Sequence, residues 1–214
     1  MTDSEDEARA VVQALAECDS EAMARLERLS TLVAAENAHQ NLISAESLGK
    51  IWQRHIADSA QLLKFVPREI SSPWLDLGTG AGFPGLIVAL LRPDCEVLLV
   101  ESRARRIAWL KQVCQDLELN NAVVLGQRIE LVATRPMRVI SARAFAPLDK
   151  LLMLSARFST AATVWLLPKG RSAQQELYSL EGWYHKFHVE PSETDAAAGV
   201  IIGHLEGRKG RKPS

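Results

Sequence analysis

The residues best suited to chemistry lie in a glycine-rich segment, DLGTGAGFPG at positions 76–85. The segment follows a short, mostly apolar run at 74–77 and precedes an apolar run at 86–91. Glycines between a strand and a helix let the backbone turn tightly and approach a ligand closely. Positions 80–85 also match the GxGxxG pattern of dinucleotide-binding proteins, so the glycines alone leave the ligand open.

Two acidic residues narrow the choice of ligand. Asp76 lies two positions before the first glycine, where a carboxylate would repel a pyrophosphate and favour a cationic group such as the amino group of a methionine moiety. Glu101 ends the next predicted strand, 25 residues later, and an acid there suits the two hydroxyls of an adenosine ribose. Glu101 therefore fits both NAD and S-adenosylmethionine, whereas Asp76 favours S-adenosylmethionine. A tight turn that binds no ligand is the third interpretation.

The elements that must position these residues alternate between strands and helices. Strands are predicted at 74–77, 96–100, 122–125, 139–141 and 163–167, with helices at 86–91 and 103–117. This alternation is typical of a parallel sheet covered by helices. Two late strands at 183–189 and 199–205 have no helix between them, which suits an antiparallel pair. Earlier in the chain, helical periodicity predicts helices at 5–17, 20–37 and 47–65, the last capped by Ser47.

Composition excludes several classes of protein. The chain has 214 residues, of which 47% are hydrophobic and 24% charged, as in ordinary globular proteins. Its longest apolar run is the six residues at 86–91, so no membrane span is expected, and the acidic, polar first 30 residues indicate no secretory signal. The three cysteines are far apart and form no CxxC pair, so neither a disulfide framework nor a zinc site is expected, and a reducing cytoplasm fits.

Charge is distributed unevenly along the chain. Residues 1–30 carry eight acidic and three basic side chains, whereas the rest of the chain has a net charge of +4 and ends in a basic tail. An acidic beginning with a basic body suggests a polyanionic partner. A solvated surface with a frayed tail would explain the same counts.

Four further motifs accompany the glycine-rich segment. They are NLIS at 41–44, RHIADS at 54–59, SARAFA at 141–146 and LPKGR at 167–171. In this order they resemble the bacterial small-subunit ribosomal RNA guanine-N7 methyltransferases, once called glucose-inhibited division protein B, over about residues 20–205. The resemblance implies an α/β fold, that of class I S-adenosylmethionine-dependent methyltransferases. Such a fold is Rossmann-like, with a mostly parallel seven-stranded sheet and an antiparallel last strand, and here it carries an N-terminal helical extension.

The resemblance also implies a reaction and its residues. The methyl group of S-adenosylmethionine would pass to N7 of the guanine at position 527, in the 530 loop of 16S rRNA. Cofactor contacts would fall on Gly78, Phe83, Ile129, Glu130 and Arg143. To these the glycine-rich segment and its acidic neighbours add Asp76, Gly80 and Glu101.

The expected chemistry needs alignment rather than a base, because N7 of guanine has a lone pair and no proton to remove. Arg143, just after the fourth strand, is the predicted catalytic residue, and it could hold the methionine carboxylate, a phosphate or guanine O6. A surface ion pair is the alternative. Phe145 is expected either to stack on the target base or to pack in the core. His55 is expected to face inward, as a core residue or, with Asp58, as an organiser of the rim of the cofactor pocket.

Contacts with RNA phosphates are predicted for basic residues of one helix and of the loop after the fifth strand: Arg105, Arg106, Lys169 and Arg171. A charged outer helix face and a solvated loop are the alternatives. No metal site is expected.

The chain is predicted to comprise a helical extension (1–66), a methyltransferase core (67–205) and a basic tail (206–214). We expect a cytoplasmic monomer that acts on 16S rRNA or the small ribosomal subunit and does not bind membranes. A methyltransferase of another substrate, or a non-catalytic RNA-binding protein that keeps the cofactor pocket, would also fit the sequence.

Overall fold

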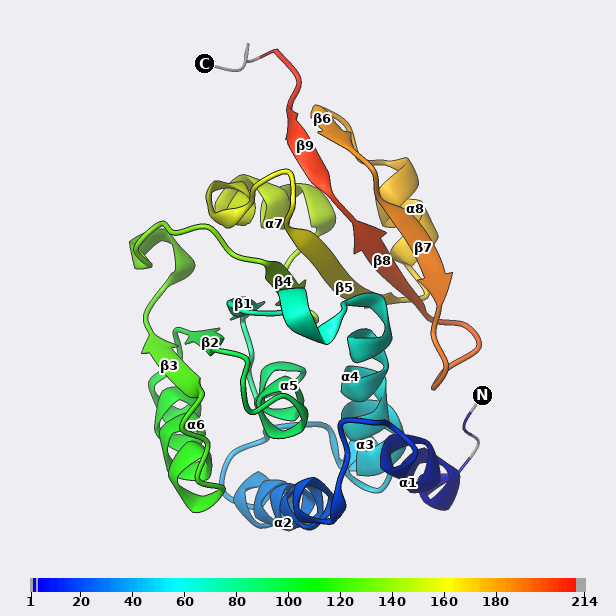
Figure 1. The fold of residues 1–214 in the computed structure, drawn as a ribbon, viewed down its shortest axis with the longest axis vertical. Coiled ribbons are helices and arrows are strands. Elements are labelled where there is room, and N and C mark those ends of the chain that lie inside the picture. Colours follow the sequence, from blue (N-terminus) through cyan, green and yellow to red (C-terminus); the bar gives the residue numbers. More distant parts are fainter. Residues whose placement is uncertain (1, 3, 211–214) are drawn as a thin grey trace.

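A seven-stranded sheet forms the centre of the computed structural model, which describes residues 2 and 4–210 (Figure 1). Its strands, in spatial order, are β3 (Ala122–Gly126), β2 (Val97–Glu101), β1 (Trp74–Leu77), β4 (Val139–Ala142), β5 (Val164–Gly170), β8 (Gly199–Gly203) and β7 (His188–Pro191). Neighbours from β3 to β5 are parallel, and β8 runs antiparallel to both β5 and β7. The predicted mostly parallel sheet with an antiparallel last strand is confirmed.

The direction in which successive strands are added to the sheet reverses beside β1. The chain proceeds outward from β1 to β2 and β3, and then returns to the other side of β1 with β4 and β5. The loops that follow β1 and β4 therefore leave the same edge of the sheet in opposite directions. In open sheets of this type, ligands bind at such a reversal, at the carboxyl ends of the strands.

Helices cover both faces of the sheet, because each face carries an apolar core (Figure 1). In β2, Val97 and Leu99 belong to one core, while Leu98 and Val100 belong to the other. The first core is covered by α2 (Ser20–Asn37), α5 (Gly85–Leu91) and α6 (Ala104–Asp116). The second core is covered by α7 (Leu148–Ser155) and α8 (Ala173–Tyr178), two helices that the sequence did not predict.

The helices before the sheet begin at side-chain caps. Ser4, Asp19 and Ser44 accept hydrogen bonds from backbone N–H groups at the starts of α1 (Glu5–Gln13), α2 and α3 (Ala45–Leu48). The predicted cap Ser47 lies instead inside α3. Apolar residues of these helices share one core with α5 and α6, so the helical extension packs as part of the domain.

The predicted helix at 47–65 is not one regular helix. After α3 the chain forms a π-helical segment η1 (Trp52–Ala57), one α turn α4 (Asp58–Ala60) and a 3-10 segment η2 (Gln61–Phe65). The Glu5 carboxylate accepts from the N–H groups of Trp52 and Gln53, both at 2.9 Å, and so fixes the start of η1 from another helix. Further short 3-10 segments are η3 (Arg68–Ile70), η4 (Ile129–Leu131) and η5 (Ala156–Phe158).

The two predicted late strands are each divided between two sheets. Residues 183–189 form β6 (Trp183–His185) and β7, and the chain after β8 continues as β9 (Leu205–Arg208), which pairs with β6. The chain changes sheets at Gly203, whose φ is 141° and where a Cβ would overlap the Lys186 carbonyl. Part of the predicted basic tail is thus in β9, and residues 211–214 lie outside the described part of the chain.

Within the described residues, none of the helices has the length and apolarity needed to cross a membrane.

Candidate active site

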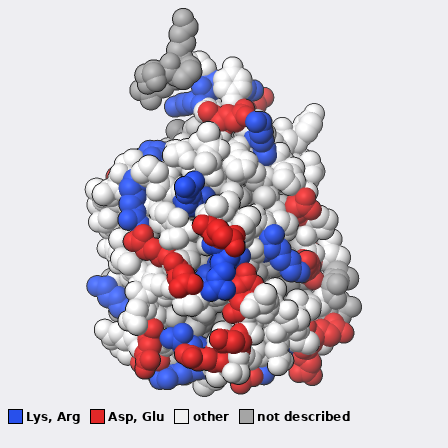
Figure 2. Space-filling model, in the orientation of Figure 1, with Lys and Arg blue, Asp and Glu red and all other residues white. Residues whose placement is uncertain are grey.

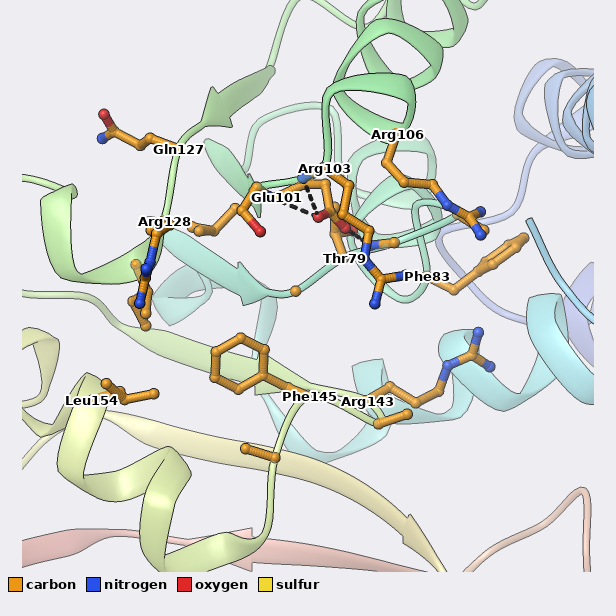
Figure 3. Close-up of a pocket in the computed structure, with 18 of the residues that line it drawn as sticks. Thr79, Phe83, Glu101, Arg103, Arg106, Gln127, Arg128, Arg143, Phe145 and Leu154 are labelled. Carbon is orange, nitrogen blue, oxygen red and sulfur yellow. Dashed lines mark hydrogen bonds between the residues drawn. The ribbon is translucent and has the colours of Figure 1, made fainter. Parts of the chain in front are cut away.

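A cavity of about 490 Å³ opens at the carboxyl edge of the sheet (Figure 3). In this view the segments after β1 and β2 form its upper wall, and the segment after β4 and helix α7 form its lower wall. Leu42 and Ile43, from the chain between α2 and α3, complete the lining. The predicted cofactor residues in its wall are Gly78, Gly80, Phe83, Glu101, Ile129, Glu130 and Arg143.

The glycine-rich segment presents bare backbone to this cavity. Gly78, Gly80 and Gly82 have φ angles of 63°, 59° and 109°, which L-residues rarely adopt. A Cβ at Gly78 would overlap the Phe145 ring, which packs against this glycine. At Gly80 no side chain lies within 4 Å of the Cβ position, so the backbone there can approach a ligand without an intervening side chain.

Asp76 is the predicted cofactor residue that the structure places elsewhere. Its carboxylate is completely buried and does not line the cavity. Oδ2 accepts the Gly85 N–H at 3.0 Å, and Oδ1 accepts the Ser141 hydroxyl at 2.7 Å. Burial raises the pKa of Asp76, and these hydrogen bonds oppose the rise. The predicted direct contact with a methionine amino group does not fit this burial, and Asp76 instead joins the end of the glycine-rich segment to β4.

Glu101 lies at the cavity wall, as predicted, and also holds the local backbone together (Figure 3). Oε1 accepts the N–H groups of Ser102 at 2.7 Å and Arg103 at 2.9 Å, and Oε2 accepts the Gly80 N–H at 3.1 Å. One carboxylate thus joins the glycine-rich segment to the chain that leads into α6.

Changing Glu101 to alanine is expected to weaken cofactor binding at least about tenfold, because a charged acceptor is worth roughly 1.5–3 kcal/mol. The sequence alone predicts an unchanged melting temperature without cofactor. The three N–H groups would lose their acceptor, so these contacts lead us instead to expect the melting temperature to fall by several degrees. Calorimetric titration and thermal unfolding test both effects. Unchanged affinity would contradict the assignment of Glu101 to the ligand.

The turn after β3 is fixed by Arg157, a residue that the sequence analysis missed. Its Nη2 donates to the Ile129 carbonyl at 2.5 Å and its Nη1 to the Val132 carbonyl at 2.8 Å. Ile129 is buried against the cavity, whereas the Glu130 side chain is exposed and pairs with Arg128 at 2.9 Å. This pairing lowers the pKa of Glu130. The apolar side chain and the backbone are therefore the parts of this turn that suit a ligand.

Arg143 is held by residues of the N-terminal helices. Its guanidinium donates to His55 Nδ1 at 2.9 Å and to the Arg54 carbonyl at 3.1 Å, and it lies 3.5 Å from Asp58 Oδ2. The charge also lies over the Phe83 ring, 5.4 Å from its centroid. The predicted alternative of a surface ion pair does not describe this half-buried arrangement.

His55 faces inward, as expected, and contacts the predicted catalytic residue. Its ring stacks on Phe83 with centroids 5.1 Å apart. Burial, together with the positive charges of Arg143 and Arg54, lowers the pKa of His55 to about 3. The imidazole is therefore neutral at physiological pH. Because a guanidinium can only donate, Nδ1 is the acceptor and the ring proton lies on Nε2.

A second cavity, of about 590 Å³, lies on the other side of the chain that follows β4. The four residues 143–146 line both cavities. His55, Asp58, Lys169 and Glu176 contribute polar groups to the second one. Two cavities thus meet at Arg143.

The Lys169 ammonium group is not free to contact an RNA phosphate. Its side chain is 7% exposed, and Nζ bonds the Ala146 carbonyl at 2.7 Å and Glu176 at 2.9 Å. The predicted RNA contact is incompatible with this burial. Its carboxylate partner belongs to α8, which the sequence did not predict, so no local signal could have shown the pair.

The other predicted RNA residues separate into two groups. The side chains of Arg105 and Arg171 are exposed. Arg106 instead lines the first cavity and donates to the Asn41 carbonyl, and burial lowers its pKa. Figure 2 shows Lys and Arg interspersed with Asp and Glu on the face it presents. Among residues 2 and 4–210, no group of three or more His, Cys, Asp or Glu side chains is arranged to hold a metal ion.

Known proteins are similar to this chain in sequence, and others are similar in fold. The family model described as rRNA small subunit methyltransferase G matches residues 22–200. Proteins named ribosomal RNA small subunit methyltransferase G are similar over most of their length. The one from Erythrobacter litoralis is 54% identical over 204 residues, covering 95% of this chain and 97% of the relative. The one from Novosphingobium aromaticivorans is 52% identical over 213 residues, covering 98% and 92%.

Solved structures share the architecture at much lower identity. Cofactor-bound Rv0187 from MTB superposes with a TM-score of 0.64 at 13% identity, covering 97% of this chain and all 100% of that one. Aeropyrum pernix fibrillarin gives 0.52 at 16% identity, covering 71% and 75%. These likenesses, with the observed strand order, confirm the class I methyltransferase fold. By its sequence, the chain belongs to the rRNA small subunit methyltransferase G family.

Proposed function

We propose that this protein transfers a methyl group from S-adenosylmethionine to N7 of the guanine at position 527 in 16S rRNA. The observation that carries the proposal is the junction of two cavities at residues 143–146. One cavity would hold the methyl donor and the other the acceptor base, so that the methyl group passes between them beside Arg143. Family membership supplies the substrate class.

The first cavity has the features that S-adenosylmethionine requires. The Glu101 carboxylate is an acceptor for ribose hydroxyls, and the buried Ile129 side chain offers an apolar surface for adenine. The bare backbone at Gly80 has only the Gly78 carbonyl within 4 Å of its Cβ position, at 3.7 Å, so a ligand can approach it closely. When bound, the sulfonium group supplies an activated methyl group.

The protein's own part in the reaction is alignment. N7 carries a lone pair and no proton, so no side chain has to remove one. Accordingly, the imidazole nearest the junction, His55, is neutral and is already bonded to Arg143. Arg143 presents a fixed positive group at the junction, suited to a carboxylate of the donor or to O6 of the acceptor. Phe145 lines both cavities and offers a flat surface to a purine.

The substrate is proposed to be 16S rRNA, free or within the small subunit, in the cytoplasm. A monomer is sufficient, since residues of one chain form both cavities. The test is incubation with labelled S-adenosylmethionine and 16S rRNA or small subunits that lack the modification, followed by mapping of the labelled base. Label at N7 of that guanine supports the proposal. Transfer to a free nucleoside or to another macromolecule, or cofactor binding without any transfer, would contradict it.

RNA binding is expected to depend on Arg105 and Arg171. Changing both to glutamate should lower the affinity for 16S rRNA about tenfold or more and reduce its salt dependence, because charge-neutralising contacts release counterions. Affinity for S-adenosylmethionine should not change. Arg106 is left out because it lines the cofactor cavity. The control is Arg28→Glu, the same substitution at one exposed position of α2, which carries half the charge change of the double variant. RNA affinity that is equal in all three proteins would exclude these contacts.

A further inference from the structure

The π-helical segment η1 coincides with the residues that contact Arg143. It spans Trp52–Ala57 and so contains both Arg54 and His55. A π turn shifts the hydrogen-bond register of a helix, and such turns occur frequently at functional sites. Here the segment directs the Arg54 carbonyl and the His55 ring to the same guanidinium, at 3.1 and 2.9 Å. In Figure 3 Arg143 lies beside this helix, drawn in cyan.

Asp58, one turn further along, is itself held in place. Its Oδ1 accepts Gln61 Nε2 at 2.8 Å and the Thr194 hydroxyl at 2.9 Å, and its Oδ2 faces Arg143 at 3.5 Å. The Arg54 side chain pairs with Asp195 at 2.7 Å. The helix that contacts Arg143 is therefore anchored to the turn between β7 and β8.

The three acceptors fix the direction of Arg143. A guanidinium donates in one plane, so a ring nitrogen, a carbonyl and a carboxylate from one helix restrict its rotamer. His55 can serve as an acceptor only while neutral, and its burial against Phe83 keeps it so. The charged groups around it are Arg54, Asp58 and Arg143.

We infer that His55 is a positioning residue: as a neutral hydrogen-bond acceptor on the N-terminal helices, it orients Arg143 at the junction of the two cavities. The inference rests on the proposed function, because Arg143 is given its role there. On this view the helical extension is a working part of the methyl-transfer site. A histidine that only fills core space would contribute nothing through Arg143.

A double-mutant cycle separates these two roles. His55→Phe keeps a ring against Phe83 but cannot accept from Arg143, whereas His55→Asn keeps an acceptor oxygen near the position of Nδ1. We expect the single-turnover rate to fall at least tenfold in His55→Phe and to recover to within about threefold of wild type in His55→Asn. In an Arg143→Ala background, His55→Phe should change the rate less than twofold. The control is His185→Phe, another histidine stacked on a phenylalanine at 5.1 Å, which should keep the full rate.

The results of this cycle distinguish failure of the inference from failure of the proposed function. Equal losses in His55→Phe and His55→Asn, or a full further loss when His55→Phe is added to Arg143→Ala, would overturn the inference while leaving the proposed function intact. A wild-type protein that methylates no guanine in 16S rRNA contradicts the proposed function and the inference together. If thermal unfolding shows that His55→Phe does not fold, the cycle of His55→Ala with Arg143→Ala decides, and additive losses there would also overturn the inference.

Discussion

Replacing Arg143 with alanine is expected to lower the single-turnover rate of guanine methylation by about 100-fold, the size of effect that a misplaced reactant produces. The loss should be the same at every pH from about 6.5 to 9, because the guanidinium acts through a fixed charge and not through a proton. The measurement is methyl transfer to 16S rRNA at saturating cofactor and RNA. Arg138→Ala is the control, since Arg138 is exposed next to the opposite end of β4.

The wild-type rate should also be nearly flat over this range. With its pKa lowered to about 3, His55 stays neutral throughout and has no titration to reveal. A rate that rises steeply with pH, and loses that rise in His55→Ala, would show that a base removes a proton. The target atom would then be an amine or a hydroxyl, and the assignment to N7 would fail.

Changing Gly78 to valine is expected to weaken S-adenosylmethionine binding at least about tenfold, or ~1.4 kcal/mol. Two effects act together at this position. The φ of 63° is unfavourable for a β-branched residue, and a Cβ would overlap the Phe145 ring. Relief of the overlap must move either the glycine-rich segment or Phe145, and both line the cofactor cavity.

Gly182→Val is the matched control for Gly78→Val. Gly182 also has a positive φ, of 78°, but no atom lies within 4 Å of the Cβ position. Both variants therefore carry backbone strain, and the overlap with Phe145 is confined to Gly78→Val. Calorimetric titration should show reduced affinity in Gly78→Val and wild-type affinity in Gly182→Val. Equal affinities in the two variants would remove the glycine-rich segment from the cofactor site.

The sequence predicts best those parts of the site whose signal is local. The glycine-rich segment directly follows a short apolar strand, and Glu101 ends the next strand. The sequence could therefore predict that these residues form part of the cavity wall. Asp76 shows the limit of that argument. Its position before the glycines suggests a ligand contact, but its contacts with Gly85 and Ser141 depend on how β4 packs beside β1.

Contacts between residues far apart along the chain could not be predicted from the sequence. Arg143 and His55 are 88 residues apart, and no periodicity indicates that they meet. The π-helical segment has no sequence signal of its own, so residues 47–65 have the pattern of one ordinary helix. Lys169 is basic and follows a strand, which suggests RNA, but its partner Glu176 comes from a helix with only six residues. Gly203 ends β8 two residues before β9 starts, and the Lys186 backbone beside it leaves no space for a side chain.

The anchoring of the N-terminal helices to the turn between β7 and β8 has a consequence for the order in which the chain folds. Arg54 and Asp195 are separated by 141 positions, and Asp58 and Thr194 by 136. Pairings this distant along the chain form late, because closing such long loops costs entropy before any contact repays it. During synthesis the glycine-rich segment and β2 are available long before Thr194 and Asp195 leave the ribosome. The helix that contacts Arg143 therefore gains its anchor to Thr194 and Asp195 only when the last strands join the sheet.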